Sequence, residues 1–188
     1  MKILLHICCA PCSIEVVDSL RSAGHDLTGF WYNPNIHPHA EYIARRACLE
    51  AYARDIGLDM IWSGGYDPAA FLREVWSTSD GDISRCRSCY GMRMEAAAAR
   101  SAAGGFDAFA TTLCVSPYQN HTLLRESIAA AAERHGVTGI YEDMSPRFRQ
   151  GRARARGAGM YMQKYCGCIL SEGDRYRMEE ARNSGLNP

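Results

Sequence analysis

The chain has 188 residues, which is enough for one domain with a hydrophobic core of its own. Its hydrophobic fraction of 47% and charged fraction of 22% are ordinary for a soluble globular protein, and no apolar run approaches the ~20 residues of a membrane span. The apolar start at residues 2–7 is too short for a signal peptide and runs into cysteines. We therefore expect a cytoplasmic protein whose thiols stay reduced.

Short apolar runs alternate with helical patterns along the chain. In chain order, strands are predicted at Lys2–Ile7, Asp26–Tyr32, Asp59–Trp62, Asp107–Leu113 and, more weakly, Ile140–Glu142. Helices are predicted between them at Ser13–Ala23, His39–Ile56, Asp67–Trp76, Ser88–Ala103 and Asn120–His135, with a polar loop at Ser77–Arg85 and a short helix at the C-terminus.

Residues at the predicted helix ends support these boundaries. Ser13 is a plausible N-cap, and Asp67 followed by Pro68 is typical of a helix start. Gly104-Gly105 and Gly136 are typical of helix ends. Strands that alternate with helices indicate parallel βαβ units, so we expect a three-layer α/β fold with a doubly wound, mostly parallel sheet. The whole chain, 1–188, is predicted to form a single domain.

The distinctive side chains follow the predicted strands. Cys8 and Cys9 follow the first strand, Asn33 to Asn35 follow the second, and residues 111–118 follow the fourth. Ligands of doubly wound sheets bind outside the carboxyl ends of the strands. The motifs are therefore expected to share one site.

Seven of the nine cysteines form three tight groups: Cys8, Cys9 and Cys12; Cys86 and Cys89; and Cys166 and Cys168. Soft thiolates at such spacing indicate a site for a soft metal or an iron–sulfur cluster. One zinc ion or one cubane cluster takes about four thiolates, so the other three would serve a second metal, form a redox pair or play no part. Cys48 and Cys114 lie in apolar patterns and are predicted to pack in the core.

Two other interpretations of the cysteines stay open. Cys9-Ala-Pro-Cys12 lies between a strand and a helix, where the helix N-terminus lowers a thiol pKa, so a thiol–disulfide oxidoreductase would also use it. A zinc-stabilised RNA-binding module is the alternative without catalysis.

The charge is balanced overall, with 21 basic and 21 acidic residues, but no acidic residue occurs between positions 147 and 164. A basic stripe on an otherwise acidic protein is a candidate site for nucleic-acid phosphates, and a solvated helix face is the alternative. The basic residues of this segment are Arg147, Arg149, Arg152, Arg154, Arg156 and Lys164.

Nearly the whole chain carries a series of unusual motifs in a fixed order. They are His6-x-Cys8-Cys9-Ala10-Pro11-Cys12, Tyr32-Asn33-Pro34-Asn35-Ile36, Glu41-Tyr42 with Arg45, Cys86-x-x-Cys89-Tyr90 with Arg93, Gly105-Phe106-Asp107, Thr111-Thr112-Leu113, Ser116-Pro117-Tyr118-Gln119-x-His121 and Tyr165-Cys166-Gly167-Cys168. This series resembles the epoxyqueuosine reductase family QueH.

The resemblance implies a Rossmann-like, adenine nucleotide hydrolase-like fold and an oxidoreductase of tRNA queuosine biosynthesis. Such an enzyme reduces the epoxide of epoxyqueuosine at the tRNA wobble position, in the last step of the pathway, and releases the oxygen as water. A [4Fe-4S] cluster with an adjacent iron ion is implied, together with an external electron donor. Neither DNA nor a membrane is an expected partner.

We expect the seven grouped cysteines to hold the cluster and the iron, without a division between the two. Candidate proton donors are Tyr118, His121 and Tyr165. Asn33, Asn35, Gln119 and Asn120 are candidates for hydrogen bonds to the substrate, and the basic residues from Arg147 to Lys164 for contacts with tRNA phosphates.

Overall fold

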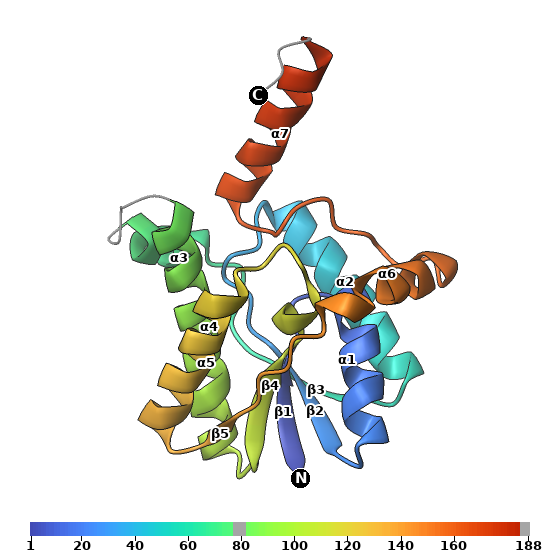
Figure 1. The fold of residues 1–188 in the computed structure, drawn as a ribbon, viewed down its shortest axis with the longest axis vertical. Helices are drawn as coiled ribbons and strands as arrows, with labels where there is room; N and C mark the ends of the chain where they lie inside the picture. The colour runs from blue at the N-terminus through green and yellow to red at the C-terminus, as the bar shows by residue number, and fades with distance from the viewer. Residues whose placement is uncertain (77–81, 185–188) are drawn as a thin grey trace.

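A parallel five-stranded sheet forms the centre of the molecule (Figure 1). The computed structural model describes residues 1–76 and 82–184, with the backbone alone at 82–84. The strand order is β3-β2-β1-β4-β5, and every pair of neighbours is parallel. The strands are β1 (Lys2–His6), β2 (Asp26–Trp31), β3 (Asp59–Trp62), β4 (Ala108–Thr111) and β5 (Thr138–Gly139). This order confirms the predicted doubly wound sheet.

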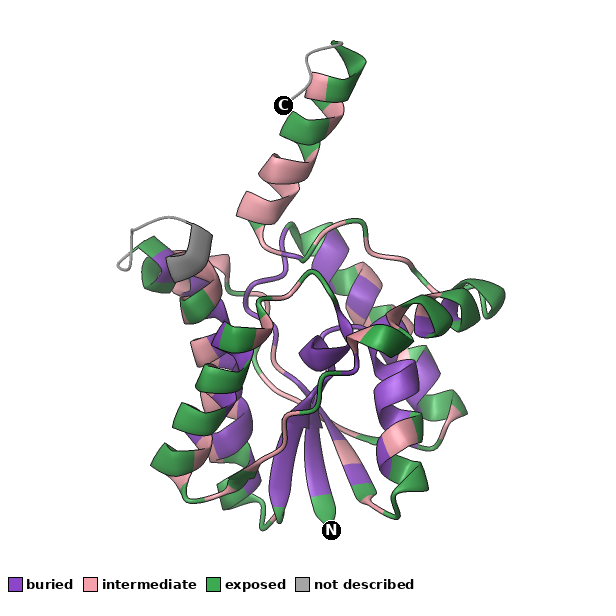
Figure 2. Ribbon diagram, viewed as in Figure 1, coloured by how far each residue is buried: buried purple, intermediate pink, exposed green. Residues whose placement is uncertain are grey.

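Helices cover both faces of the sheet, which makes three layers (Figure 1). One layer contains α1 (Ala10–Ser22), α2 (His39–Asp55) and α6 (Phe148–Gly157), and the other contains α4 (Asp82–Ala103) and α5 (His121–His135). Helix α3 (Pro68–Trp76) packs against α4. Helix α7 (Ile169–Asn183) projects away from the sheet, and none of its residues is buried (Figure 2).

The core lies where the central strands meet the helices (Figure 2). Strand β1 pairs with a strand on each side, so its apolar residues Ile3, Leu4 and Leu5 have no exposed surface. Cys114 is buried and Cys48 is half-buried against the same core, as predicted. Among the described residues, no helix has the length and apolar character needed to cross a membrane.

Two predicted boundaries near the site were wrong. Helix α1 begins at Ala10 with Cys9 as its N-cap residue, and Ser13 lies inside the helix, where its hydroxyl donates to the carbonyl oxygen of Ala10 at 2.7 Å. Strand β4 ends at Thr111, and the chain then turns through a short 3-10 helix, η1 (Thr112–Val115).

Two other boundaries also differ from the prediction. Helix α4 begins at Asp82, so residues 82–85 are helical instead of loop, while residues 77–81 of that predicted loop lie outside the described part. Strand β5 lies at Thr138–Gly139 instead of 140–142. The other helix signals are confirmed, because Asp67 Oδ1 accepts a hydrogen bond from the Ala70 amide at 3.1 Å and Gly136 is left-handed.

Candidate metal and substrate site

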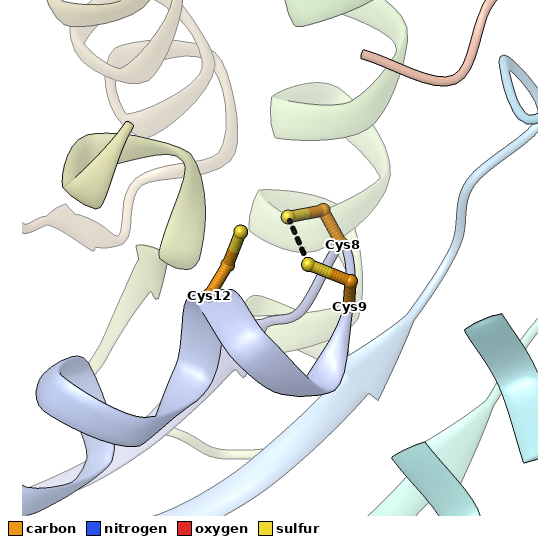
Figure 3. A group of neighbouring side chains, drawn as sticks. All are labelled: Cys8, Cys9 and Cys12. Carbon is orange, nitrogen blue, oxygen red and sulfur yellow. Dashed lines mark hydrogen bonds between the residues drawn. The ribbon is translucent and has the colours of Figure 1, made fainter. Parts of the chain in front are cut away.

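Three thiols gather where β1 passes into α1 (Figure 3). Cys8 follows the strand, Cys9 is the N-cap residue of the helix and Cys12 lies in its first turn. All three are buried, their sulfur atoms lie within 4.8 Å of one another, and the sulfurs of Cys8 and Cys9 are 3.8 Å apart. Hydrogen bonds from Cys12 and Cys9 hold the pKa of Cys8 well below its usual range. This thiol triad is suited to binding a soft metal.

The other four grouped cysteines come from α4 and from the segment before α7. Cys86 and Cys89 lie one turn apart on α4, and Cys168 is the N-cap residue of α7, where its sulfur accepts a hydrogen bond from the Ser171 amide at 3.3 Å. The pKa of Cys89 is raised to about 12, mainly by burial, while the charge of Arg93 lowers it and the negative charges of Cys166 and Cys168 raise it. Burial also raises the pKa of Cys86, and the same two negative charges add to this effect. The four thiols therefore share one electrostatic environment.

Arg93 links this environment to the triad. Its side chain is 1% exposed, and its guanidinium donates to Asn33 Oδ1 at 2.8 Å and to the sulfur of Cys89 at 3.8 Å. Burial opposes its charge, but the negative charges of Cys89 and Cys8 raise the pKa of Arg93 overall. A permanent buried cation thus lies within reach of both groups and stabilises thiolates in each.

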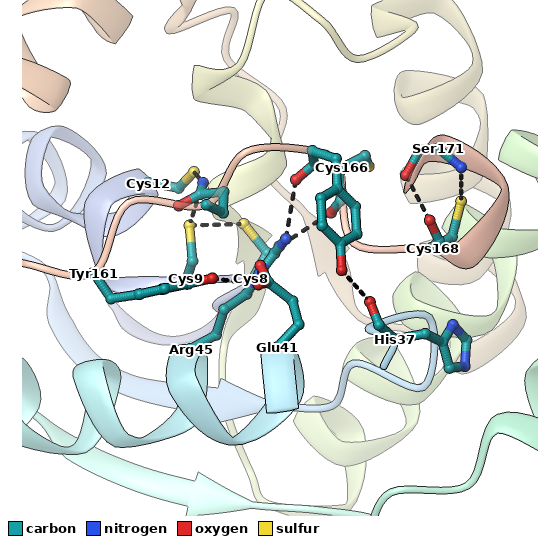
Figure 4. A network of polar contacts seen from close by, with 12 residues as sticks. Cys8, Cys9, Cys12, His37, Glu41, Arg45, Tyr161, Cys166, Cys168 and Ser171 are labelled. Carbon is teal, nitrogen blue, oxygen red and sulfur yellow. Dashed lines mark hydrogen bonds and ion pairs between the residues drawn. The ribbon is translucent and has the colours of Figure 1, made fainter. Parts of the chain in front are cut away.

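A buried ion pair holds the segment that carries Cys166 (Figure 4). Arg45 Nε lies 2.7 Å from Glu41 Oε1, one turn earlier on α2. The other two guanidinium nitrogens of Arg45 donate to the carbonyl oxygens of Tyr165 and Cys166, at 2.9 and 3.1 Å. The hydroxyl of Tyr161 donates to the second carboxylate oxygen of Glu41. One guanidinium therefore fixes the backbone beside Cys166.

Gly167 allows this close approach. Its φ is +126°, and a Cβ atom at this position would lie only 3.2 Å from Arg45 Nη1 and 3.3 Å from Asn35 Nδ2. Its carbonyl oxygen accepts a hydrogen bond from the His37 amide at 2.8 Å. The glycine between Cys166 and Cys168 is thus needed for both conformation and space.

A cavity of about 720 Å³ opens beside the thiols. Cys8, Cys12 and Cys166 contribute to its wall, so it touches the triad and the second group. Arg152, Lys164 and Arg175 also line it. The volume suits a small organic ligand or one nucleoside, and the basic side chains favour an anionic one.

The three predicted proton donors lie in different places. Tyr118 and Tyr165 line the cavity. The Tyr165 hydroxyl donates to the carbonyl oxygen of His37, and burial raises its pKa, with the negative charge of Glu41 adding to the effect. The two ring nitrogens of His121 lie 2.9 Å from the Tyr141 hydroxyl and 3.0 Å from the Ser116 carbonyl oxygen. His121 therefore supports the loop that carries Tyr118.

The four predicted polar substrate ligands are engaged to different degrees. Asn33 is buried and uses both ends of its amide, since Nδ2 donates to the Ile7 carbonyl oxygen at 2.9 Å and Oδ1 accepts from Arg93. Asn35 is also buried, and its Oδ1 has no hydrogen-bond partner among the described residues. Gln119 lines the cavity, and its Nε2 lies 3.7 Å from the sulfur of Cys166. Asn120 caps α5 through the Leu123 amide at 3.1 Å.

The predicted basic stripe divides into three parts. Arg152 and Lys164 line the cavity, and Arg147, Arg149 and Arg156 are exposed near it in sequence. Arg154 instead pairs with two carboxylates of α1, Glu15 at 2.9 Å and Asp18 at 2.6 Å. Arg154 thus ties α6 to α1, and it is less available to a phosphate than the others.

The interpretation of the sequence missed Gln163. Its side-chain amide donates to the sulfur of Cys9 at 3.0 Å and to that of Cys12 at 3.4 Å. It lies in an irregular segment, so no helical or strand pattern pointed to it. The roles of Arg45 and Arg93 were also not foreseen, although both stand in the motifs of the resemblance.

These features define a class of protein, an α/β protein with a doubly wound parallel sheet whose carboxyl edge carries a cavity rich in thiols. A solved structure described as the predicted subunit of tRNA methyltransferase from Methanocaldococcus jannaschii is similar in fold. The TM-score is 0.56, with 12% sequence identity, and the match covers 83% of this chain and 74% of that one. At this identity the similarity concerns the fold alone.

The sequence comparisons are more specific. The family model described as "Epoxyqueuosine reductase QueH" matches residues 3–174. Curated relatives with this description include those of Dehalococcoides mccartyi, 34% identical over 93% of this chain and 94% of the relative, and of Acinetobacter baylyi, 34% identical over 97% and 86%. The relative from Thermotoga maritima is 30% identical over 90% and 89%. The chain therefore belongs to the epoxyqueuosine reductase QueH family, which confirms the resemblance found in its motifs.

Proposed function

We propose that this protein reduces epoxyqueuosine in tRNA to queuosine in the cytosol, with electrons from an external donor. Membership of the QueH family is the observation that carries the proposal. The reaction takes up two electrons and two protons, breaks both carbon–oxygen bonds of the epoxide and releases water, leaving a carbon–carbon double bond. The thiol-lined cavity of about 720 Å³ has the size for one modified nucleoside.

We propose that Cys8, Cys9, Cys12, Cys86, Cys89, Cys166 and Cys168 hold a [4Fe-4S] cluster and an adjacent iron ion. The donor set fits these groups, because it offers soft thiolates from three segments and places buried N–H donors beside them. Gln163 donates to two sulfurs of the triad, and Arg93 donates to Cys89. When bound, the cluster and the iron supply single electrons and an electrophile for the epoxide oxygen.

The residues around the cavity would bind and orient the substrate. Gln119 carries the amide group best placed to bond the hydroxyls of the modified base, because it lines the cavity. Asn35 stays a second candidate, since its buried Oδ1 has no hydrogen-bond partner among the described residues. Arg152 and Lys164 would hold phosphates at the cavity. The exposed Arg147, Arg149 and Arg156 would extend this contact along the RNA.

Tyr165 is the proton donor that the geometry favours. It lines the cavity, and its raised pKa keeps its hydroxyl protonated at neutral pH. Tyr118 and His121 stay secondary candidates, since the first is mostly exposed and the second does not line the cavity.

One observation disfavours the thiol–disulfide alternative. Cys9 is 1% exposed, and Gln163 covers its sulfur. A protein disulfide therefore has no direct access to the first thiol of the Cys9–Cys12 pair.

The test is reduction of an RNA that contains epoxyqueuosine, under anaerobic conditions, with a low-potential chemical reductant. The nucleoside product should be lighter by one oxygen atom, as measured by mass spectrometry after digestion. Tyr165→Phe should lower kcat by roughly 10²-fold or more while the iron content and RNA affinity stay unchanged. The control is Tyr176→Phe, on the exposed part of α7. Wild-type protein that is loaded with iron and does not reduce the RNA would refute the proposal.

A further inference from the structure

Tyr118 lies at the rim of the cavity with most of its ring in solvent. It is 83% exposed, the highest exposure among the large hydrophobic side chains described, although it lines the cavity. It follows Ser116-Pro117 in the loop that leads to α5. An aromatic side chain held at the mouth of a basic cavity is placed to contact what enters it.

Two residues of α6 complete a small aromatic cluster around Tyr118. The rings of Tyr118 and Phe148 are 5.6 Å apart between centroids and inclined at 83°, an edge-to-face pair. The guanidinium of Arg152 lies 5.5 Å from the centroid of the Phe148 ring. Because one ring of an edge-to-face pair presents only its edge, at least one face of Tyr118 stays uncovered.

The charge around the cluster indicates what covers that face. Arg152, Lys164 and Arg175 line the same cavity, and Arg147 and Arg149 flank Phe148 in the sequence. Cations beside an open aromatic face are the combination that proteins use to bind single-stranded nucleic acid, with phosphates on the cations and a base on the ring. An apolar protein partner would not need these charges.

We propose that Tyr118, Phe148 and Arg152 form a stacking platform for an unpaired nucleobase of the RNA, adjacent to the nucleotide that enters the cavity. The inference rests on the proposed function, because it takes the RNA substrate as given. Stacking tolerates different bases, so the platform positions the RNA and leaves recognition of the modified base to the cavity.

The test measures the affinity for a synthetic anticodon stem–loop RNA with guanosine at the wobble position. Tyr118→Ala should weaken binding by about tenfold, from the loss of one stacked base. Tyr118→Phe keeps the ring and should bind within about twofold of the wild type, while Tyr118→Leu should behave like the alanine variant. Trp76→Ala is the control, since Trp76 is an aromatic side chain 70% exposed on α3 and does not line the cavity.

A second RNA, with an abasic nucleotide next to the wobble position, identifies the stacked base. The wild type should bind this RNA more weakly than the intact RNA when the missing base is the one that stacks on Tyr118. Tyr118→Ala should bind the two RNAs equally. Equal binding of the wild type and Tyr118→Ala to the intact RNA would overturn the platform, as would equal losses in Tyr118→Phe and Tyr118→Ala. If the wild type reduces the RNA that contains epoxyqueuosine while Tyr118→Ala binds the guanosine stem–loop normally, only the platform fails. If the wild type neither binds the guanosine stem–loop nor reduces the RNA that contains epoxyqueuosine, the proposed function fails as well.

Discussion

The side-chain amide of Gln163 donates a hydrogen bond to the sulfur of Cys9, with 3.0 Å between nitrogen and sulfur. The two residues are 154 positions apart, and the contact closes the irregular segment before Cys166 over the thiol triad. Gln163 thus covers the triad and supplies a donor to it, which gives it a measurable electronic role.

Gln163→Leu should lower the reduction potential of the iron–sulfur centre. N–H donors to thiolate sulfur stabilise the reduced state, because that state carries more negative charge on the centre. A redox titration followed by electron paramagnetic resonance would measure the shift. Gln150→Leu, on the exposed side of α6, serves as the control. An unchanged or higher potential in Gln163→Leu would show that the contact has no such effect.

Arg45→Met should destabilise the protein by about 3 kcal/mol, because it leaves the carboxylate of Glu41 buried without its cation. The matched control is Arg46→Met, since Arg46 forms the same one-turn pair with Glu50 at the surface and should lose less than about 1 kcal/mol. Urea unfolding of the two variants gives the comparison. Similar losses in both would mean that burial of the Arg45 pair is energetically unimportant.

Substitutions of Arg154 and of Arg149 should affect different properties, stability in the first case and RNA binding in the second. Arg154→Met removes the cation beside the buried Glu15 and should cost about 1–3 kcal/mol of unfolding free energy. Arg149 is exposed, so Arg149→Met should change stability by less than about 0.5 kcal/mol. It should instead weaken RNA affinity and reduce the salt dependence of binding by about one unit of slope. Unaltered RNA affinity and salt slope in Arg149→Met would exclude this phosphate contact.

The buried thiol of Cys114 should make the protein less stable in alkali. Burial raises the pKa of Cys114 from 9.0 to about 12. Between these values the unfolded chain has lost the proton and the folded chain keeps it, so the free energy of unfolding falls as pH rises. By pH 10.5 this thiol accounts for about 2 kcal/mol of the loss relative to pH 7. Stability should therefore fall less steeply above pH 9 in Cys114→Ala than in the wild type, as measured by urea unfolding. Parallel pH profiles would contradict the assignment.

The general architecture was predictable from local patterns. Alternating strands and helices indicated a parallel sheet, and the carboxyl ends of its strands do carry Cys8, Cys9 and Asn33. The start of α1 was misplaced because Ser13 is a good N-cap residue by composition, whereas the chain begins the helix at Ala10 with Pro11 in the first turn. Tertiary packing decided between two locally acceptable starts.

The polar framework of the site was not predictable in the same way. Arg45, Arg93 and Gln163 gain their roles only when distant segments meet, so neither spacing nor propensity marks them. The charge pattern also could not show that Arg154 is paired with carboxylates while Arg152 lines the cavity. The partners of Arg154, Glu15 and Asp18, lie on a helix far away in the sequence.

The central claim is that the grouped thiols hold iron and sulfide. The most direct measurement is the count of iron, sulfide and zinc per chain in protein purified without oxygen, together with its visible absorption. We predict brown protein with about four or more irons and about four sulfides. Serine variants of Cys8 and of Cys89 should lower these counts, while Cys48→Ser should leave them unchanged. Colourless protein that carries one zinc, or that takes up no iron and sulfide on reconstitution, would contradict the account.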